Sequence, residues 1–178
     1  MSTAIPSPLR REPQLAGQTV VVIGGSAGIG LETARLAHAE GATLVLTARN
    51  PERLQLVARE LTTASTVAFD ATDFERVAQF FDELPAPIDH LLLTGPGPYY
   101  ASLADFNFEK ARRTIEAYLF LSLQVARHAA NKVRPGGTLL FMGGTGGRRT
   151  AKGFALIFSI LSIIVTVSSD SFGFTKSD

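Results

Sequence analysis

A run of β-branched residues that ends at a glycine-rich turn constrains the fold of this chain more than any other feature. Residues 20–23 are all valine or isoleucine, and the glycines that follow include Gly24, Gly28 and Gly30. An apolar run without alternation indicates a strand buried on both faces of a parallel sheet. Gly41 supplies a stop signal for the helical pattern that comes next. The stretch therefore predicts a strand, a glycine turn and a helix in succession.

The glycines of this turn have distinct expected roles in holding a nucleotide. Gly24 allows the tight turn, Gly28 leaves no side chain in the way of a phosphate, and Gly30 lets the helix lie close to the strand. Phosphates at this place meet backbone amides and the positive end of the helix dipole. Ser26 offers a hydroxyl, although an ordinary turn serine explains it equally well. The candidate nucleotide-binding residues are therefore Gly24, Ser26, Gly28, Ile29 and Gly30, with a plain strand-to-helix turn as the alternative.

Strand and helix patterns alternate along the rest of the chain, which indicates an α/β layer structure with a parallel sheet. The chain has 178 residues, of which 46% are hydrophobic, and this is enough for the core of one domain. We therefore expect a single three-layer, Rossmann-like domain, built on a doubly wound parallel sheet, over residues 17–152. Residues 1–16 are expected to form a flexible arm, and residues 153–178 an apolar helix with an irregular tail.

Local signals predict where the helices begin and end. Asn50 supplies a cap and is followed by a proline at the first helical position. Thr72 and Glu75 have the spacing of a capping box for the next helix. A later, long helix is expected to end near Arg134, before a fifth strand over residues 138–142. The apolar residues that mark this helix are Phe108, Ile115, Leu119, Leu123 and Ala126.

The spacing Gly24-x-x-x-Gly28-x-Gly30 resembles the cofactor loop of the short-chain dehydrogenase/reductase family. Three further stretches resemble that family: the second strand with its ribose-binding end, the adenine-binding acidic turn after the third strand, and the fourth strand. They are residues 42–50, 69–73 and 88–95. The resemblance runs from about residue 17 to residue 142 and implies an NAD(P)-dependent oxidoreductase.

The resemblance also implies cofactor contacts at the carboxyl ends of the strands. Asp70 matches the acid that binds the adenine amino group, with a turn or capping acid as its alternative role. Thr94 and Gly95 stand where the family commonly carries an Asn-Asn-Ala-Gly motif that supports the cofactor and the sheet, so the sequence departs from the family there. A 2′-phosphate needs a cation, whereas a free ribose is usually held by an acid at the end of the second strand. Arg49 stands near that end, where no acid occurs, so we expect NADP rather than NAD unless Arg49 is only a solvated residue before a helix.

The catalytic half of the family pattern is missing from the sequence. The resemblance implies a serine after the fifth strand and a Tyr-x-x-x-Lys motif on the next helix, which together polarise a carbonyl and transfer a proton. Here the serine region contains Thr145, for which an ordinary turn residue is the better explanation, and no tyrosine follows Tyr118. Tyr118 itself stands at about the position where many members carry an asparagine. We assign no catalytic residue and predict an altered or incomplete catalytic centre.

Composition excludes several classes of site and partner. A net charge of +1 gives no general attraction to nucleic acid. The chain has no cysteine, so it forms no disulfide and no thiolate metal site, and we predict no metal. The first 16 residues lack an apolar core long enough for a signal sequence, and we therefore expect a cytoplasmic protein.

An apolar run occupies residues 154–167. It is shorter than the roughly 20 residues needed to cross a bilayer, so we expect no membrane span. An interface helix fits better, which predicts a homodimer through this segment. Complete family members continue with further strands and a substrate-covering loop, so the small-molecule substrate is not predicted and the fold is expected to be incomplete at its C-terminus.

Two functions follow from these patterns. The first is an NADP-dependent oxidoreductase whose catalytic centre is altered or incomplete. The second is a non-catalytic dinucleotide-binding or interaction protein. A truncated gene product, with final residues foreign to the fold, is a further alternative.

Overall fold

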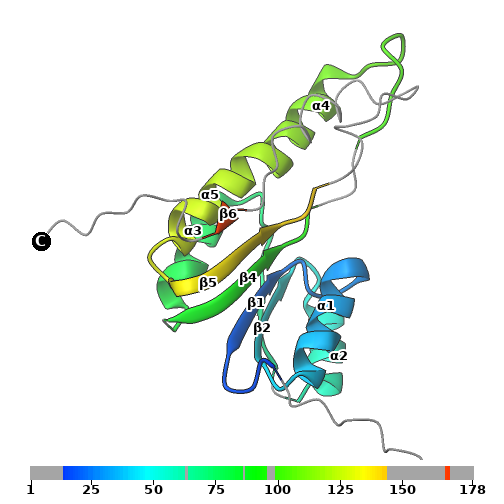
Figure 1. Ribbon diagram of the computed structural model, residues 1–178. Helices are drawn as coiled ribbons and strands as arrows, with labels where there is room; N and C mark the ends of the chain where they lie inside the picture. The colour runs from blue at the N-terminus through cyan, green and yellow to red at the C-terminus, as the bar shows by residue number, and fades with distance from the viewer. Residues whose placement is uncertain (1–13, 63, 86, 96–98, 144–166, 169–178) are drawn as a thin grey trace, which may run out of the picture.

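A six-stranded sheet forms the centre of the computed structural model, which describes residues 14–62, 64–85, 87–95, 99–143 and 167–168 (Figure 1). The strand order is β3-β2-β1-β4-β5-β6, in which β1 to β5 run parallel and β6 is antiparallel to β5. This doubly wound order confirms the predicted α/β fold. The strands are β1 (Thr19–Ile23), β2 (Thr43–Ala48), β3 (Ala64–Ala68), β4 (Ile88–Leu93), β5 (Val133–Phe141) and β6 (Val167–Ser168).

Helices cover both faces of the sheet and complete the three layers. In Figure 1, α1 and α2 lie together on one side, and α3 and α5 lie on the other. The long helix of the second side consists of α4, a π-helical turn η1 and α5. The helices are α1 (Gly28–Ala39), α2 (Pro51–Glu60), α3 (Phe74–Glu83), α4 (Phe108–Ile115), η1 (Glu116–Phe120) and α5 (Leu121–Ala129).

The central strand β1 connects the two halves of the core. Val21 and Ile23 pack with α3 and α5, whereas Val20 and Val22 pack with α1 and α2. All four side chains are buried, as expected of a strand covered on both faces. Burial of each such side chain contributes about 1.5–3 kcal/mol. The apolar run of the sequence is thus explained by the two helical layers.

One predicted helix cap is confirmed and another is wrong. Asn50 caps α2, and its Oδ1 accepts a hydrogen bond of 2.7 Å from the Arg53 backbone N–H. Helix α3, however, is capped by Asp73 and not by Thr72. The Asp73 carboxylate accepts from two backbone N–H groups of the first turn, which a threonine hydroxyl one residue earlier does not reach.

The predicted long helix is present, and the residues that it buries differ from those that mark it in the sequence. The buried residues are Ala111, Ala117, Leu121, Val125 and Ala129. Two of the residues that mark the helix, Phe108 and Leu123, are 79% and 57% exposed. Large apolar residues lie on opposite sides of this helix, and the sheet covers the side that carries Leu121 and Val125.

The fifth strand begins earlier than predicted, at Val133, and the helix before it ends at Ala129. Its pairing with β4 jumps from Ile88 opposite Val133 to His90 opposite Thr138. Residues 134–137 therefore form a bulge inside the strand rather than a turn before it. Gly136 permits this bulge because its φ is +79°, in the left-handed region.

The two predicted terminal segments lie mostly outside the described residues. Of the predicted arm, residues 14–16 are described, and the Leu15 N–H donates to the Glu40 carbonyl at 3.0 Å. Of the predicted C-terminal segment, only Val167 and Ser168 are described. Apart from its last residue, Val167, which lies in strand β6, the predicted interface helix lies outside the described part of the chain. Among the described helices, none has the length and apolar character to cross a membrane.

Candidate functional site

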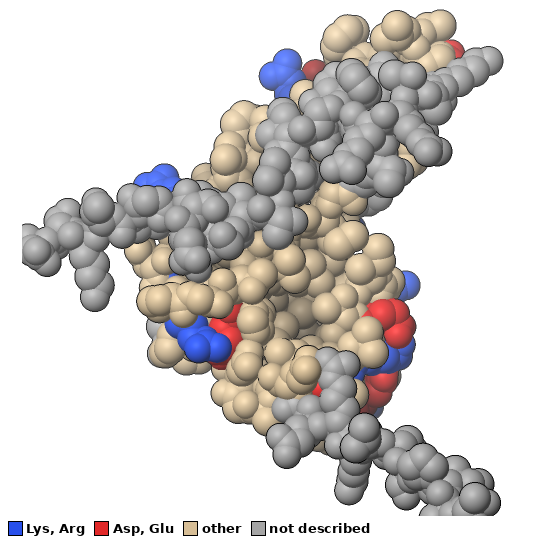
Figure 2. Space-filling model, viewed as in Figure 1, with Lys and Arg blue, Asp and Glu red and all other residues tan. Residues whose placement is uncertain are grey.

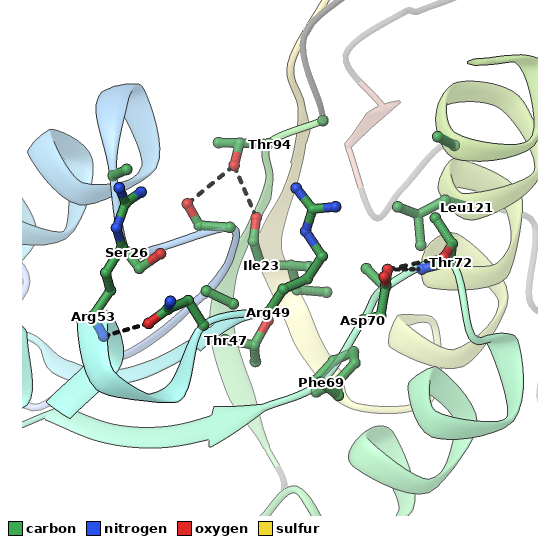
Figure 3. A pocket seen from close by; sticks show the side chains of 17 residues that line it. Ile23, Ser26, Thr47, Arg49, Arg53, Phe69, Asp70, Thr72, Thr94 and Leu121 are labelled. Atoms are coloured by element: carbon green, nitrogen blue, oxygen red, sulfur yellow. Dashed lines mark hydrogen bonds between the residues drawn. The ribbon is translucent and has the colours of Figure 1, made fainter. Parts of the chain in front are cut away.

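A cleft of about 320 Å³ lies at the carboxyl ends of the parallel strands, beside the point where the strand order reverses (Figure 3). This is the place where doubly wound sheets bind their ligands. Residues from the ends of β1, β2 and β4, from the turn after β3, and from the long helix form its walls. The lining residues are Ile23, Gly24, Ser26, Ala27, Thr47, Ala48, Arg49, Asn50, Arg53, Phe69, Asp70, Ala71, Thr72, Thr94, Gly95, Ala117 and Leu121.

The glycine turn combines a left-handed backbone with open space next to the start of α1. Gly24 has a φ of +93°, and the Gly24 and Gly25 N–H groups both donate to the Thr47 carbonyl at 2.9 Å. Gly28 has a φ of +55°, and a Cβ there would meet no protein atom within 4 Å. Helix α1 starts at Gly28 after Ala27, which has no side-chain acceptor for the first amides of the helix. An anion can therefore approach these amides closely.

Gly30 has a different role in the turn. A Cβ on Gly30 would lie only 2.3 Å from the Gly24 carbonyl oxygen, so α1 packs against the turn more closely than any side chain allows. Ile29 points elsewhere, because its side chain is 59% exposed and does not line the cleft. Gly28, Ile29 and Gly30 shape the start of α1, whereas Gly24 and Ser26 line the cleft.

Thr94 ties the end of β4 to the glycine turn. Its backbone N–H donates to the Ile23 carbonyl at 2.9 Å, and its hydroxyl lies 3.0 Å from the Ile23 carbonyl oxygen and 3.3 Å from that of Gly24. Both Thr94 and Gly95 line the cleft. The threonine hydroxyl thus links the sheet and the turn at the position where the sequence departs from the Asn-Asn-Ala-Gly pattern.

Two arginines line the side of the cleft formed by the β2–α2 connection, Arg49 and Arg53. In the described part of the chain, neither guanidinium forms an ion pair or a side-chain hydrogen bond. Among the described residues that line the cleft, Asp70 is the only acid. The cleft therefore carries an excess of positive charge that suits an anionic ligand.

Asp70 lies on the opposite side of the cleft, in a turn with Thr72 (Figure 3). Its Oδ1 accepts from the Thr72 N–H at 3.0 Å and from the Thr72 hydroxyl at 2.9 Å. Its other oxygen, Oδ2, has no hydrogen-bond partner among the described residues. Asp70 thus belongs to a turn, which was its alternative expected role.

The structure brings six of the predicted residues together around one cleft: Gly24, Ser26, Arg49, Asp70, Thr94 and Gly95. Sequence reasoning missed Arg53, Asn50 and the contribution of the long helix, Ala117 and Leu121. The one local signal for Arg53 is its place in the first turn of α2, three residues after the N-cap Asn50.

Tyr118 lies beside the cleft, in the π-helical turn that precedes α5. Its ring packs against Gly95, where a Cβ would come within 3.1 Å of Tyr118 Cε1. Burial raises the pKa of the Tyr118 phenol above its ordinary value, and the charge of Tyr100 raises it further. Thr145, the other hydroxyl considered for catalysis, lies outside the described residues.

Charged side chains are sparse on the face in Figure 2, where those of the described residues occur in small groups of both signs. The positive character of the cleft is thus a local property, set by Arg49 and Arg53, and not part of a broad basic surface on this face.

Proteins of known sequence that resemble this chain are dehydrogenases and reductases. Dehydrogenase/reductase SDR family member 7B of Danio rerio is 32% identical over 125 residues, which are 63% of this chain and 40% of that protein. Short-chain dehydrogenase/reductase ATR9 of Stachybotrys chlorohalonatus is 25% identical over 167 residues, which are 85% of this chain and 66% of that protein. The chain thus spans between two fifths and two thirds of the length of these two relatives.

Solved structures share the fold. A dehydrogenase/reductase from Sinorhizobium meliloti 1021 matches 85% of this chain with a TM-score of 0.78 and 25% identity, over 64% of its own length. BdcA in complex with NADPH matches 83% of this chain with a TM-score of 0.75 and 24% identity, over 61% of its own length. The family model described as short chain dehydrogenase matches residues 18–156. With this match over most of its length, and with a glycine turn and cleft at the switch point of its sheet, the chain belongs to the short-chain dehydrogenase/reductase family.

Proposed function

We propose that this chain binds NADP(H) in preference to NAD(H) and is an oxidoreductase with an altered or incomplete catalytic centre. The observation that carries the proposal is the place of Arg49, which lines the same cleft as Gly24 and Asp70. A guanidinium binds a phosphate monoester well, and no acid lines the end of β2 to hold a free ribose instead.

The cleft residues fit the parts of such a dinucleotide in order. The glycine turn, Ser26 and the first amides of α1 would hold the pyrophosphate. Asp70 would hold the adenine, Arg49 the ribose phosphate, and Thr94 and Gly95 would line the nicotinamide end. When bound, the cofactor supplies or accepts a hydride. BdcA, which has the same fold, binds NADPH, and this supports the choice of ligand.

Cofactor titrations test the proposal. NADPH and NADH are titrated against the wild type, Arg49→Ala and Arg59→Ala, the last being a control on the exposed end of α2 away from the cleft. Wild type and the Arg59 variant should prefer NADPH, and the Arg49 variant should lose about tenfold or more of that preference, since a charged hydrogen bond contributes about 1.5–3 kcal/mol. Equal affinities for both cofactors, unchanged by Arg49→Ala, would refute the NADP assignment.

A second candidate function is non-catalytic dinucleotide binding. One observation favours it: the sequence has no Tyr-x-x-x-Lys motif after the fifth strand. Binding without turnover over a broad panel of carbonyl and alcohol substrates would select this function over the oxidoreductase.

We also propose a homodimer through residues 154–167. Exposed apolar side chains on the long helix support this proposal, because association of two copies could cover them. They are Phe108, Phe120 and Leu123. Sedimentation should show a dimer for the wild type and a shift toward monomer for Ile160→Asp. A wild type that remains monomeric at high concentration would contradict this proposal.

A further inference from the structure

We propose that Arg53 acts with Arg49 as an arginine pair that binds the phosphate on the adenosine ribose, so that Arg53 is a second determinant of cofactor specificity. The inference rests on the proposed function and adds to it a contact from helix α2, through Arg53. It concerns the recognition of a ribose phosphate monoester and not of the pyrophosphate.

The backbone fixes Arg53 at the mouth of the cleft. Arg53 is the third residue of α2, and its N–H donates to the side chain of the N-cap Asn50 at 2.7 Å. Helix α2 begins just after β2 ends, and the intervening residues include Arg49. Arg49 directly precedes the N-cap Asn50 and Arg53 is the third residue of α2, so both belong to the same short stretch at the cleft wall.

The side chains of the arginine pair extend to the same side of the β2–α2 connection in Figure 3, with Arg49 between Arg53 and Asp70 in that view. Both line the cleft, as does the N-cap Asn50. The first turn of α2 adds the positive end of its helix dipole. An anion held between the two guanidinium groups would lie at the wall of the cleft that the β2–α2 connection forms.

The chemistry of the pair fits a phosphate monoester. Such a group carries up to two negative charges, and each guanidinium presents a planar fork that can donate two hydrogen bonds to it. Arg35, by contrast, is held in ion pairs with Glu32 of α1 and Glu60 of α2. Within the described part of the chain, neither Arg49 nor Arg53 forms an ion pair. No ion pair between described residues therefore has to break before these guanidinium groups bind a ligand.

Two probes that differ only by the ribose phosphate test the inference without turnover: adenosine 2′,5′-bisphosphate and adenosine 5′-monophosphate. Each is titrated by calorimetry against the full chain as wild type, Arg53→Ala, Arg53→Lys, Arg49→Ala and the control Arg59→Ala. The Arg53→Ala exchange keeps the N–H that Asn50 caps and introduces a good helix former, so α2 should persist, which circular dichroism can verify.

The expected result is selective. Arg53→Ala should weaken the bisphosphate about tenfold and the monophosphate less than about twofold, while Arg59→Ala changes neither, because only the 2′-phosphate loses a charged donor. Arg53→Lys should restore part of the loss, since it keeps the charge without the fork. An equal loss for both probes would overturn the inference, because Arg53 would then contact the 5′-phosphate or the adenine. An Arg53→Ala variant that matches Arg59→Ala would overturn it as well.

The same titrations separate this inference from the proposed function. If the wild type discriminates between the two probes and Arg49→Ala abolishes the difference while Arg53→Ala does not, the proposed function stands and the arginine pair does not. If the wild type binds both probes equally, the NADP assignment and the arginine pair fail together.

Discussion

The hydroxyl of Thr94 occupies the space that a side chain on Gly24 would need: a Cβ on Gly24 would lie 2.0 Å from Thr94 Oγ1. The same hydroxyl is within hydrogen-bond distance of the Ile23 and Gly24 carbonyls. The end of β4 and the glycine turn are thus packed together without room for a methyl group, and the shape of the cleft depends on this contact.

The first prediction follows from this packing. Gly24→Ala should destabilise the protein strongly, because it combines a φ of +93° with the clash against Thr94. In a Thr94→Ala background the same exchange should cost less, because the clashing hydroxyl is gone. Chemical denaturation of the wild type, the two single variants and the double variant measures the coupling free energy between the two positions. If the losses of unfolding free energy are strictly additive, the two residues do not interact sterically.

Thr94 alone should matter less to stability than Gly24. Thr94→Val removes the hydroxyl but keeps the shape, so the free energy of unfolding should fall by about 1 kcal/mol, the usual net contribution of one hydrogen bond. Thr43→Val, on the exposed start of β2, is the control and should be near neutral. A loss no larger than that of the control would mean that the hydroxyl contacts contribute nothing measurable.

Gly28→Val should abolish dinucleotide binding and leave most of the fold intact. No protein atom lies within 4 Å of the new Cβ, so the cost to folding is mainly the left-handed backbone at φ +55°, about 1–2 kcal/mol. The side chain would instead project where a phosphate approaches. Gly17→Val is the matched control, since Gly17 also has open space and a positive φ, +76°, but precedes β1. NADPH binding by the Gly28 variant at wild-type strength would contradict the assignment of the glycine turn.

Turnover of ordinary ketones, aldehydes and alcohols should be weak or absent. Hydride transfer to a carbonyl leaves an alkoxide that needs a proton, and a general acid commonly accelerates such a step about 10²–10⁴-fold. The sequence lacks the Tyr-x-x-x-Lys group that serves this purpose in the family. The rate of turnover is measured as the change in NADPH absorbance with each substrate of a panel. Brisk turnover that disappears in Thr145→Ala or Tyr118→Phe would reveal a catalytic group where none is assigned.

Tyr118 should ionise later than an ordinary tyrosine. Its pKa is raised mainly by burial, so the folded protein holds this proton more tightly than the unfolded chain does. The contribution to stability is fully present below the unfolded pKa and is lost as the pH rises through the folded pKa. Alkaline titration of tyrosine absorbance should therefore show a late component that Tyr118→Phe removes. An identical titration curve in the variant, scaled for one fewer phenol, would count against the burial of this group.

The sequence predicts the sheet and the glycine turn well because both leave local signals. The run from Val20 to Ile23 needs two covering layers, and Gly24 and Gly28 both adopt the left-handed backbone that favours glycine. The Asn50 cap of α2 is equally local, since its donor is three residues away.

The long helix shows where local patterns fail. Leu119 and Leu123 repeat at helical spacing, and so do Leu121 and Val125 on the opposite side. Hydrophobic periodicity therefore predicts two apolar faces on the helix, and it does not indicate which of them packs against the sheet. The π-helical turn Glu116–Phe120 shifts the helical phase between α4 and α5, and the periodicity of the sequence gives no sign of it.

Arg53 was missed for a similar reason. Its part in the cleft depends on the angle at which α2 leaves the sheet, and sequence spacing alone does not fix this angle. Asp73 displaced Thr72 as the cap of α3 because two adjacent residues could each begin the helix, and the carboxylate satisfies two N–H groups at once.

The most direct measurement is a titration of the purified wild-type chain with NADPH, followed by calorimetry or by cofactor fluorescence. Our account predicts saturable binding at one site per chain, stabilisation against unfolding that grows with NADPH concentration, and displacement by adenosine 2′,5′-bisphosphate. A chain that is folded by circular dichroism and shows no saturable binding of NADPH would contradict the account.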